Sequence, residues 1–259
     1  MRRTKQERRR RGLWREREDM KEKWKRLVSP VVAYYRDLRP SNLRSRKYNH
    51  IFLLLYWIFY GLMFLGVERI FPMLFPGIVY HPVYCALDDL IPFCEWFVFP
   101  YYFWFAYLIV PGAIWFFWEP ESFRNFMWSI ILTYTTALVM FLVYPNMQEL
   151  RPVDFERDNF MVDIVKGLYN FDTNTNVCPS VHVLGSVSVL FAAIHSRIFS
   201  APGWQIFFWV SAVLISISTV FLRQHSVIDI FVAIGVAVLC YLVQFLLFPR
   251  LKRRMSAKG

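Results

Sequence analysis

Residues 227–248 read VIDIFVAIGVAVLCYLVQFLLF, and Asp229 is the one charged side chain in this stretch. A bilayer has a hydrocarbon core about 30 Å thick, and a helix needs roughly 20 largely apolar residues to cross it. The stretch has this length and composition. It therefore predicts a transmembrane helix that carries a carboxyl group in its first turn.

Five further segments have the apolar character and nearly the length of a span, at residues 51–67, 96–118, 126–144, 181–199 and 206–222. The fourth is the weakest, because His195, Ser196 and Arg197 shorten its apolar stretch. We expect it to be an inner helix shielded by its neighbours, and Gly185, Ser186 and Ser188 suit the close packing that this requires. The predicted fold class is all-α, a polytopic membrane helix bundle with six transmembrane helices.

The composition of the whole chain also favours a membrane protein. Its 259 residues are 56% hydrophobic and 19% aromatic, and the mean hydropathy is positive. A soluble domain of this size is less apolar. No secretory signal peptide is visible, because the first apolar run begins only near Ile51 and has the length of a span.

Basic residues are concentrated at the two ends of the chain. Residues 1–50 contain 18 Lys and Arg against 6 Asp and Glu, and residues 250–259 contain 5 Lys and Arg and no acid. Residues 51–249 contain 7 Lys and Arg against 13 Asp and Glu. Because segments rich in Lys and Arg stay in the cytoplasm, an even number of spans predicts that both termini are cytoplasmic.

The expected domains are a basic cytoplasmic arm at residues 1–50, a six-span domain at 51–248 and a basic cytoplasmic tail at 249–259. The arm mixes charge with Trp14 and Trp24, so residues 14–35 are expected to contain an amphipathic helix that lies on the membrane surface. A basic arm can in principle bind nucleic acid. Beside a membrane, anionic lipid headgroups are the expected partner, and no nucleic acid is expected.

The four cysteines form neither a disulfide framework nor a zinc signature. Cys85 and Cys94 fall in one predicted outer loop, where they either pair in an oxidising compartment or stay as thiols. The sequence shows no cluster of metal-ligand type, so neither a metal nor a cofactor is expected.

Three polar clusters interrupt the apolar chain, at residues 144–152, 178–182 and 223–229. With six spans and cytoplasmic termini, all three lie at the extracytoplasmic face of the membrane. With five spans, or with the fourth segment removed, the second and third clusters would lie on opposite sides. The common face is therefore a consequence of the predicted span count.

His225 and Asp229 are four residues apart at the start of a predicted helix, so both project from one face of it. The carboxylate can fix the imidazole tautomer and leave the other ring nitrogen free as a nucleophile. An unpaired carboxylate at the mouth of a span costs on the order of several kcal/mol, which makes Asp229 a functional candidate. The alternative is a structural pair that caps the helix.

His182 follows Ser180 at the start of the fourth predicted span, where a hydroxyl group and a helix N-terminus can hold an anion. Such an imidazole can protonate a departing alkoxide and then deprotonate the attacking acceptor. Arg151 and Arg223 are candidates for a guanidinium clamp on a phosphoryl group. The alternatives are a satisfied surface histidine, a solvated loop charge at Arg151, and an Arg223 side chain that reaches the membrane interface.

The order Arg-Pro at 151–152, Pro-Ser-x-His at 179–182 and His-x-x-x-Asp at 225–229 resembles the type 2 phosphatidic acid phosphatase superfamily. The resemblance covers roughly residues 51–248. It implies metal-independent phosphoryl transfer through a phosphohistidine. In that scheme His225 is the nucleophile, Asp229 orients it, and His182 is the acid and base. The phosphate is bound by Arg151, Ser180 and Arg223.

Several positions depart from the pattern of the family. Tyr144 stands where the first motif usually has a Lys, and Val181 replaces the usual Gly of the second. In the third motif Thr219 stands at the usual Arg position, while Arg223 lies two residues before the His. This order, together with LDDLIPF at residues 87–93, is similar to the branch that contains inositol-phosphorylceramide and sphingomyelin synthases.

The expected function is that of an integral membrane lipid phosphate phosphatase, which hydrolyses a phosphomonoester of phosphatidic acid or isoprenyl phosphate type. An alternative is a lipid phosphotransferase that moves a phospho-headgroup to a lipid or polyol acceptor. A further alternative is a non-enzymatic scaffold or transporter on the same fold. The presence of His182, His225 and Asp229 argues against this last alternative.

Overall fold

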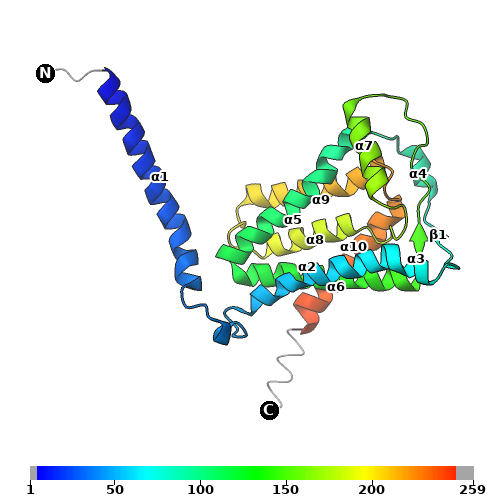
Figure 1. Ribbon diagram of the computed structural model, residues 1–259, viewed down its shortest axis with the longest axis horizontal. Helices are drawn as coiled ribbons and strands as arrows, with labels where there is room; N and C mark the ends of the chain where they lie inside the picture. Colours follow the sequence, from blue (N-terminus) through cyan, green and yellow to red (C-terminus); the bar gives the residue numbers. More distant parts are fainter. Residues whose placement is uncertain (1–4, 249–259) are drawn as a thin grey trace, which may run out of the picture. The chain divides into compact units, whose positions relative to one another are not determined.

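The computed structural model describes residues 5–248, and most of these residues are helical (Figure 1). The chain divides into two compact units, Met1–Ile51 and Phe52–Gly259. The basic tail expected at residues 249–259 lies outside the described residues. The expected boundaries of the three domains stay a prediction.

The first unit contains α1 (Lys5–Tyr35), η1 (Pro40–Asn42) and the beginning of η2 (Asn49–Leu54). α1 includes the helix expected at residues 14–35, and Trp14 and Trp24 are 60% and 69% exposed along it. Within the unit, Tyr35 Oη lies 2.7 Å from His50 Nε2, which ties the end of α1 to the start of η2. The location of α1 on a membrane surface stays a prediction.

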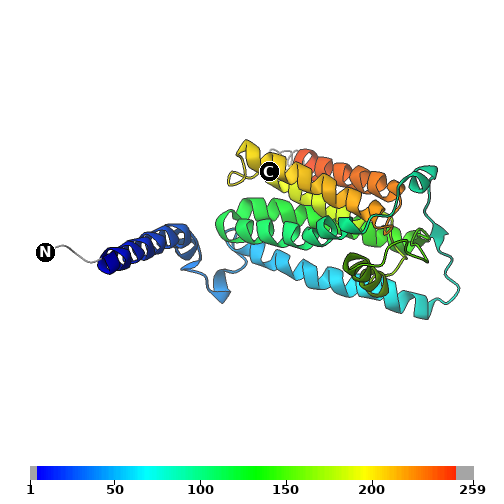
Figure 2. The same ribbon diagram turned by 90° about the horizontal axis from the view of Figure 1, so that it is seen from above.

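Six helices form the bundle of the second unit: α2 (Leu55–Leu65), α5 (Val98–Trp118), α6 (Pro120–Val143), α8 (Val181–Ile194), α9 (Pro202–Phe221) and α10 (Val227–Leu242). α10 continues into the π-helical turn η5 (Val243–Leu247). Figures 1 and 2 show these helices running along one common direction. α8 packs against α5, α6, α9 and α10, so it occupies the centre of the bundle.

Short elements gather at one end of the bundle, which we call the loop end (Figure 1). They are η3 (Gly66–Ile70), α3 (Phe71–Leu74), β1 (His81–Pro82), α4 (Ala86–Leu90), η4 (Glu95–Phe97), β2 (Asn146–Met147) and α7 (Phe160–Phe171). β1 and β2 pair in parallel, with His81 opposite Asn146 and Pro82 opposite Met147. This pairing holds the segment after α6 beside the segment after α3.

Within residues 5–248, five helices are long and apolar enough to cross a membrane, at Asn49–Leu74, Glu95–Trp118, Pro120–Val143, Pro202–Phe221 and Val227–Leu247. They indicate an integral membrane protein and agree with a mostly helical bundle. The expected number of six is not confirmed. α8 has 14 residues and is about 21 Å long at 1.5 Å per residue, which is less than the thickness of the hydrocarbon core.

α8 is short because the chain after it turns around a buried carboxylate. Glu119, between α5 and α6, is 4% exposed. Its Oε2 accepts a hydrogen bond from Ser196 Oγ at 2.5 Å, and its Oε1 accepts one from the backbone N–H of Arg197 at 2.9 Å. These contacts end the helix at Ile194, whereas the sequence predicted an end at residue 199. The burial of the helix agrees with the expectation that it is an inner, shielded helix.

Gly185 allows α8 to lie close to α5 and α6. A Cβ atom at this position would be 2.6 Å from Tyr134 Oη and 3.0 Å from Trp104 Nε1. Tyr134 also donates a hydrogen bond to the carbonyl of Val181 at 3.3 Å. Any larger residue must therefore displace side chains of two neighbouring helices.

Gly185→Ala is expected to destabilise the protein by about 1 to 3 kcal/mol, because an extra methyl group in a packed core forces its neighbours to move. Thermal unfolding in detergent measures the effect. Gly235→Ala in α10 is the matched control, since its Cβ meets nothing within 4 Å and Ala favours a helix more than Gly does. Equal unfolding temperatures for the two variants would contradict this packing.

All four cysteines are free thiols in the structure. Of the two possibilities for Cys85 and Cys94, the structure therefore shows the unpaired one. Cys85 precedes α4 and Cys94 precedes η4, so the two residues flank the α4 segment.

Candidate active site

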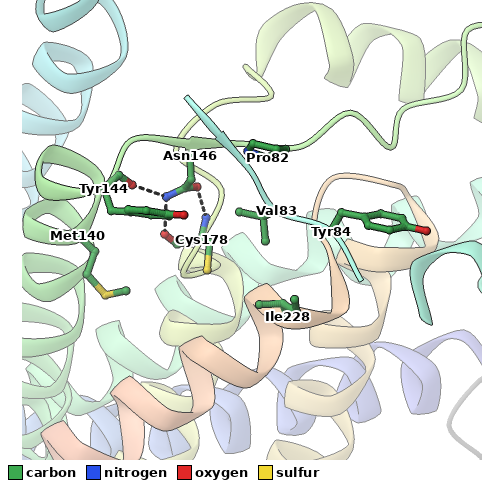
Figure 3. A pocket seen from close by; sticks show the side chains of 8 residues that line it. All are labelled: Pro82, Val83, Tyr84, Met140, Tyr144, Asn146, Cys178 and Ile228. Atoms are coloured by element: carbon green, nitrogen blue, oxygen red, sulfur yellow. Dashed lines mark hydrogen bonds between the residues drawn. The ribbon is translucent and has the colours of Figure 1, made fainter. Parts of the chain in front are cut away.

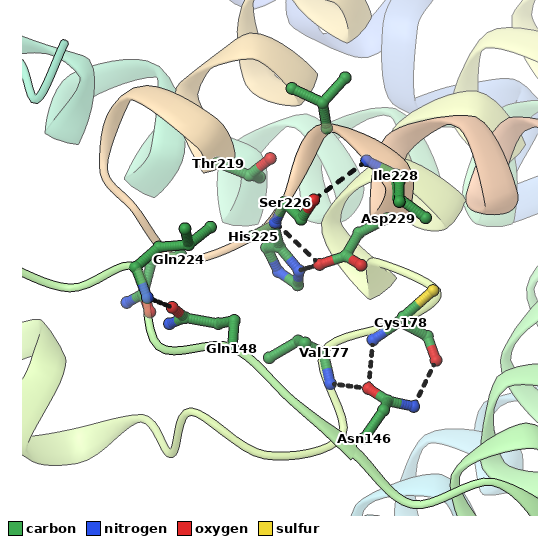
Figure 4. Close-up of polar contacts among 12 residues, drawn as sticks. Asn146, Gln148, Val177, Cys178, Thr219, Gln224, His225, Ser226, Ile228 and Asp229 are labelled. Carbon is green, nitrogen blue, oxygen red and sulfur yellow. Dashed lines mark hydrogen bonds and ion pairs between the residues drawn. The ribbon is translucent and has the colours of Figure 1, made fainter. Parts of the chain in front are cut away.

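The three polar clusters meet at the loop end of the bundle. The side-chain oxygen of Asn146 accepts hydrogen bonds from the backbone N–H groups of Val177 and Cys178 at 2.9 and 2.8 Å (Figure 4). Its amide nitrogen donates to the carbonyl of Cys178 at 2.9 Å. Arg151 Nη2 donates to Gln224 Oε1 at 2.6 Å, which connects the first cluster to the third.

His225 and Asp229 form a buried pair at the start of α10. His225 Nδ1 lies 3.0 Å from Asp229 Oδ2 (Figure 4). Asp229 is fully buried and His225 is 7% exposed. The same carboxylate oxygen accepts the backbone N–H of Ser226 at 3.1 Å. An N–H on Nδ1 that donates to this carboxylate leaves the lone pair of the imidazole on Nε2.

His182 lies in the first turn of α8, with its ring centroid 6.0 Å from that of His225. Its ring packs against Tyr101 and Trp104 at centroid distances of 4.3 and 4.4 Å. Among the described residues, His182 Nδ1 has no hydrogen-bond partner. Ser180, the N-cap residue of α8, has a buried hydroxyl group that also lacks a partner in the described part of the chain. Buried polar atoms of this kind are usually satisfied by water or a ligand.

A cavity of about 290 Å³ opens beside the two imidazoles, and we call it the histidine cavity. Its polar lining includes His182, His225, Gln224 and Asp172. Its apolar wall is largely aromatic and includes Tyr60, Phe64, Tyr101, Trp104, Phe105 and Phe171. The cavity therefore combines two imidazoles with an apolar wall, as expected of a pocket for an amphipathic molecule.

Gln224 contributes a hydrogen-bond donor that the sequence did not reveal. Its Oε1 accepts from Arg151, which fixes the orientation of the amide. Its Nε2 is buried and has no partner among residues 5–248. Gln224 thus presents an N–H group next to His225 on the cavity wall.

Asp172, the residue that follows α7, also lines the cavity. Burial raises the pKa of the Asp172 carboxyl group, although the nearby His225 and Arg151 and the hydrogen bond from Tyr101 oppose this shift. Asp172 Oδ2 accepts a hydrogen bond from Tyr101 Oη at 3.4 Å. The sequence showed Asp172 only as one of many acids in a long loop. Its position directly after the amphipathic segment 160–171 was the available signal.

Arg151 holds the loops together through its guanidinium group. Nη1 donates to the carbonyls of Tyr169 and Asp172 at 3.1 and 3.0 Å. Nη2 donates to the carbonyl of Thr173 at 2.8 Å as well as to Gln224. The group also lies 4.7 Å from the centroid of the Tyr169 ring. Only its buried Nε has no partner in the described structure.

Arg223 binds the segment around α4. Its Nη1 and Nη2 donate to the carbonyls of Asp88 and Ile91 at 2.8 and 2.6 Å. The residue has a φ of 52°, a left-handed conformation that is uncommon for a residue other than glycine and often marks a functional segment. The two predicted phosphate ligands, Arg151 and Arg223, thus direct their terminal nitrogens to backbone carbonyls.

Asp88 in α4 fixes the segment that carries His225. Its carboxylate accepts hydrogen bonds from Ser226 Oγ at 2.6 Å and from the backbone N–H of Val227 at 2.8 Å. It also accepts the backbone N–H of Cys85 at 2.8 Å and is 2% exposed. A negative charge at this place suits the N-terminus of α10. Sequence reasoning assigned no role to Asp88, although it lies in the quoted segment 87–93.

A second cavity, of about 250 Å³, lies on the Cys178 side of Asn146 (Figure 3). Tyr84, Met140 and Ile228 are among its lining residues. Burial and the neighbouring Asp229 carboxylate raise the pKa of the Cys178 thiol. Cys178 is therefore a protonated thiol at neutral pH and a poor nucleophile.

Comparisons with protein-family models, curated proteins and solved structures find no match for this chain. Within residues 5–248, no group of three or more His, Cys, Asp or Glu side chains could hold a metal ion. The structure brings His182, His225 and Asp229 together beside one cavity, while Arg151 and Arg223 bind the surrounding loops.

Asp88→Ala is expected to lower the free energy of unfolding by about 2 to 3 kcal/mol or more, because buried N–H and O–H groups lose a charged acceptor. Thermal unfolding in detergent measures the loss. Asp89→Ala is the matched control, since Asp89 is exposed and accepts a hydrogen bond from Tyr84 at the surface. If the two variants unfold at the same temperature, Asp88 does not hold α4 to α10.

Proposed function

We propose that the chain is an integral membrane enzyme that cleaves a phosphate ester of a lipid through a phosphohistidine at His225. The favoured reaction is hydrolysis of a lipid phosphomonoester of phosphatidic acid or isoprenyl phosphate type. The observation that carries the proposal is the His225–Asp229 hydrogen bond, with the His182 ring centroid 6.0 Å from that of His225 and both imidazoles on the wall of the histidine cavity. The order of motifs that resembles the type 2 phosphatidic acid phosphatase superfamily supports the same chemistry.

We also propose that α8 is a sixth crossing, shielded from lipid by the four helices around it. Six crossings return the chain to its starting side, and the basic ends then favour a cytoplasmic location for both termini. The loop end of the bundle would face the extracytoplasmic side. Burial of ten of the fourteen α8 residues supports the inner position of this helix.

In the proposed first step, His225 Nε2 attacks phosphorus and the bond from phosphorus to the lipid oxygen breaks. His182 donates a proton to the departing alkoxide. Asp229 stabilises the positive charge that develops on the His225 ring, because its carboxylate accepts the hydrogen on Nδ1. The phosphoryl group is then bonded to nitrogen, and the lipid alcohol can leave.

In the second step, His182 removes a proton from a water molecule, which attacks phosphorus and breaks the phosphorus–nitrogen bond. Free phosphate leaves and both imidazoles return to their starting protonation states. The phosphoryl oxygens need donors in both steps. Ser180 Oγ, Gln224 Nε2 and Arg151 Nε have no hydrogen-bond partner within residues 5–248, which supports their assignment as these donors. The proposal assigns Arg223 chiefly to positioning, because it binds the α4 carbonyls.

His225→Ala is expected to reduce the release of labelled phosphate from phosphatidic acid or an isoprenyl phosphate by roughly a thousandfold or more, because the nucleophile is lost. The measurement uses purified protein in detergent. His195→Ala is the matched control, since His195 is an exposed histidine that follows α8 and lies at its other end. Parent activity in His225→Ala would show that the nucleophile is assigned wrongly.

Transfer of the phosphoryl group or phospho-headgroup to a lipid or polyol is the second candidate. Asp172 favours it, because a carboxylate on the cavity wall can accept a hydrogen bond from the hydroxyl group of an acceptor. Both reactions share the first step and differ in what enters the cavity for the second.

Turnover of a lipid labelled in its phosphate distinguishes the two reactions. Hydrolysis yields free labelled phosphate, and transfer yields a second labelled lipid or a labelled polyol. For the transferase, Asp172→Asn is expected to lower the rate of labelled acceptor formation about tenfold or more, because the amide is a weaker acceptor than a carboxylate. Unchanged acceptor formation in Asp172→Asn would remove the argument for this second candidate.

A further inference from the structure

An apolar groove of about 580 Å³ lies between α2, α5 and α6. Trp57 of α2, Leu108 and Phe116 of α5, and Phe123 and Phe126 of α6 contribute to its wall. Every residue that lines the groove is apolar. A groove of this size is in the range of pockets that bury a whole ligand.

The groove adjoins the histidine cavity. Trp104 and Phe105 line both hollows. The ring of Trp104 also packs against His182 at a centroid distance of 4.4 Å. One end of the groove therefore lies at a wall that it shares with the histidine cavity, next to the proposed acid and base.

The groove follows α5 for much of the length of this helix. It extends from Trp104, near the loop end, to Phe117, close to the opposite end of α5. Thirteen residues of helix rise about 20 Å, which is more than half of a hydrocarbon core about 30 Å thick. A hydrocarbon chain in the groove would pass the middle of the bilayer.

Two small residues of α5, Gly112 and Ala113, line the groove. A Cβ atom at Gly112 would lie 3.2 Å from Cε1 of Phe126, so the glycine lets α6 lie close to α5. Ala113 follows it, is exposed and also lines the groove. A large side chain at Ala113 would fill the hollow from the lipid-facing side without entering the packed core.

We propose that this groove binds one hydrocarbon chain of the substrate lipid, which lies along α5 with its phosphate end between His182 and His225. The inference rests on the proposed function. A methylene group takes about as much space as a water molecule, about 30 Å³, so the groove holds on the order of 20 carbon atoms. This is one long chain, and the proposed substrate class is therefore a lipid phosphate with a long acyl or isoprenoid chain.

The first test compares Ala113→Phe with Val110→Phe. Val110 is also exposed on α5 but does not line the groove. The probes are octadecyl phosphate in mixed micelles and p-nitrophenyl phosphate, which has no long chain. Ala113→Phe should raise the KM for octadecyl phosphate at least tenfold and leave p-nitrophenyl phosphate turnover unchanged, whereas Val110→Phe should change neither. Equal KM values for octadecyl phosphate in the two variants would overturn the proposal.

A second measurement does not depend on turnover. An octadecyl phosphate with a photoreactive diazirine in its chain is irradiated with the full-length protein in micelles, and the labelled peptides are mapped. Labelling should centre on Leu108–Phe117 and fall at least fivefold in Ala113→Phe but not in Val110→Phe. Labelling spread evenly over the lipid-facing helices would refute the groove. Groove labelling without phosphate release would instead refute the proposed function and leave chain binding supported.

Discussion

The buried carboxylate of Asp229 constrains the whole loop end of the structure. A charge at a fully buried position is costly unless it has close partners, and here His225 Nδ1 and the backbone N–H of Ser226 supply them. Both partners lie in the segment just before α10, so this segment must have one fixed conformation. Asp88 fixes this conformation, because its carboxylate accepts hydrogen bonds from Ser226 and Val227. The pair of His225 and Asp229 therefore depends on α4, which is far away in the sequence.

Arg151 and Arg223 hold the loop segments around the site in place. The guanidinium of Arg151 joins the segment after β2 to the end of α7 and to Gln224, and that of Arg223 joins the segment before α10 to α4. Guanidinium groups suit this task because they offer several donors in a fixed plane. Among the described residues, the buried donors without a partner include Gln224 Nε2, Ser180 Oγ and Arg151 Nε, and these are the groups proposed to bind a phosphate.

Local features of the sequence predicted much of this structure. The length and hydropathy of the apolar runs located the apolar helices, and the spacing of four residues predicted the pair of His225 and Asp229. These two features could be predicted because each depends only on residues that are close together in the sequence. The end of α8 was misplaced by five residues because it is set by Glu119, which lies 77 positions away from Ser196. Asp88 and Ser226 are 138 positions apart in the sequence, and the residue pattern of neither segment predicts that they are in contact. The partners of Arg151 and Arg223 were missed for the same reason.

The packing around Gly185 connects the histidine cavity to the groove. The missing side chain at this position lets Trp104 and Tyr134 approach the backbone of α8. Trp104 is thereby placed against His182 on one side and along the groove on the other. A residue that moved Trp104 outward would change the wall of the histidine cavity and the start of the groove together. The geometry of the imidazoles and the space for a hydrocarbon chain therefore depend on the same close approach of α5 to α8.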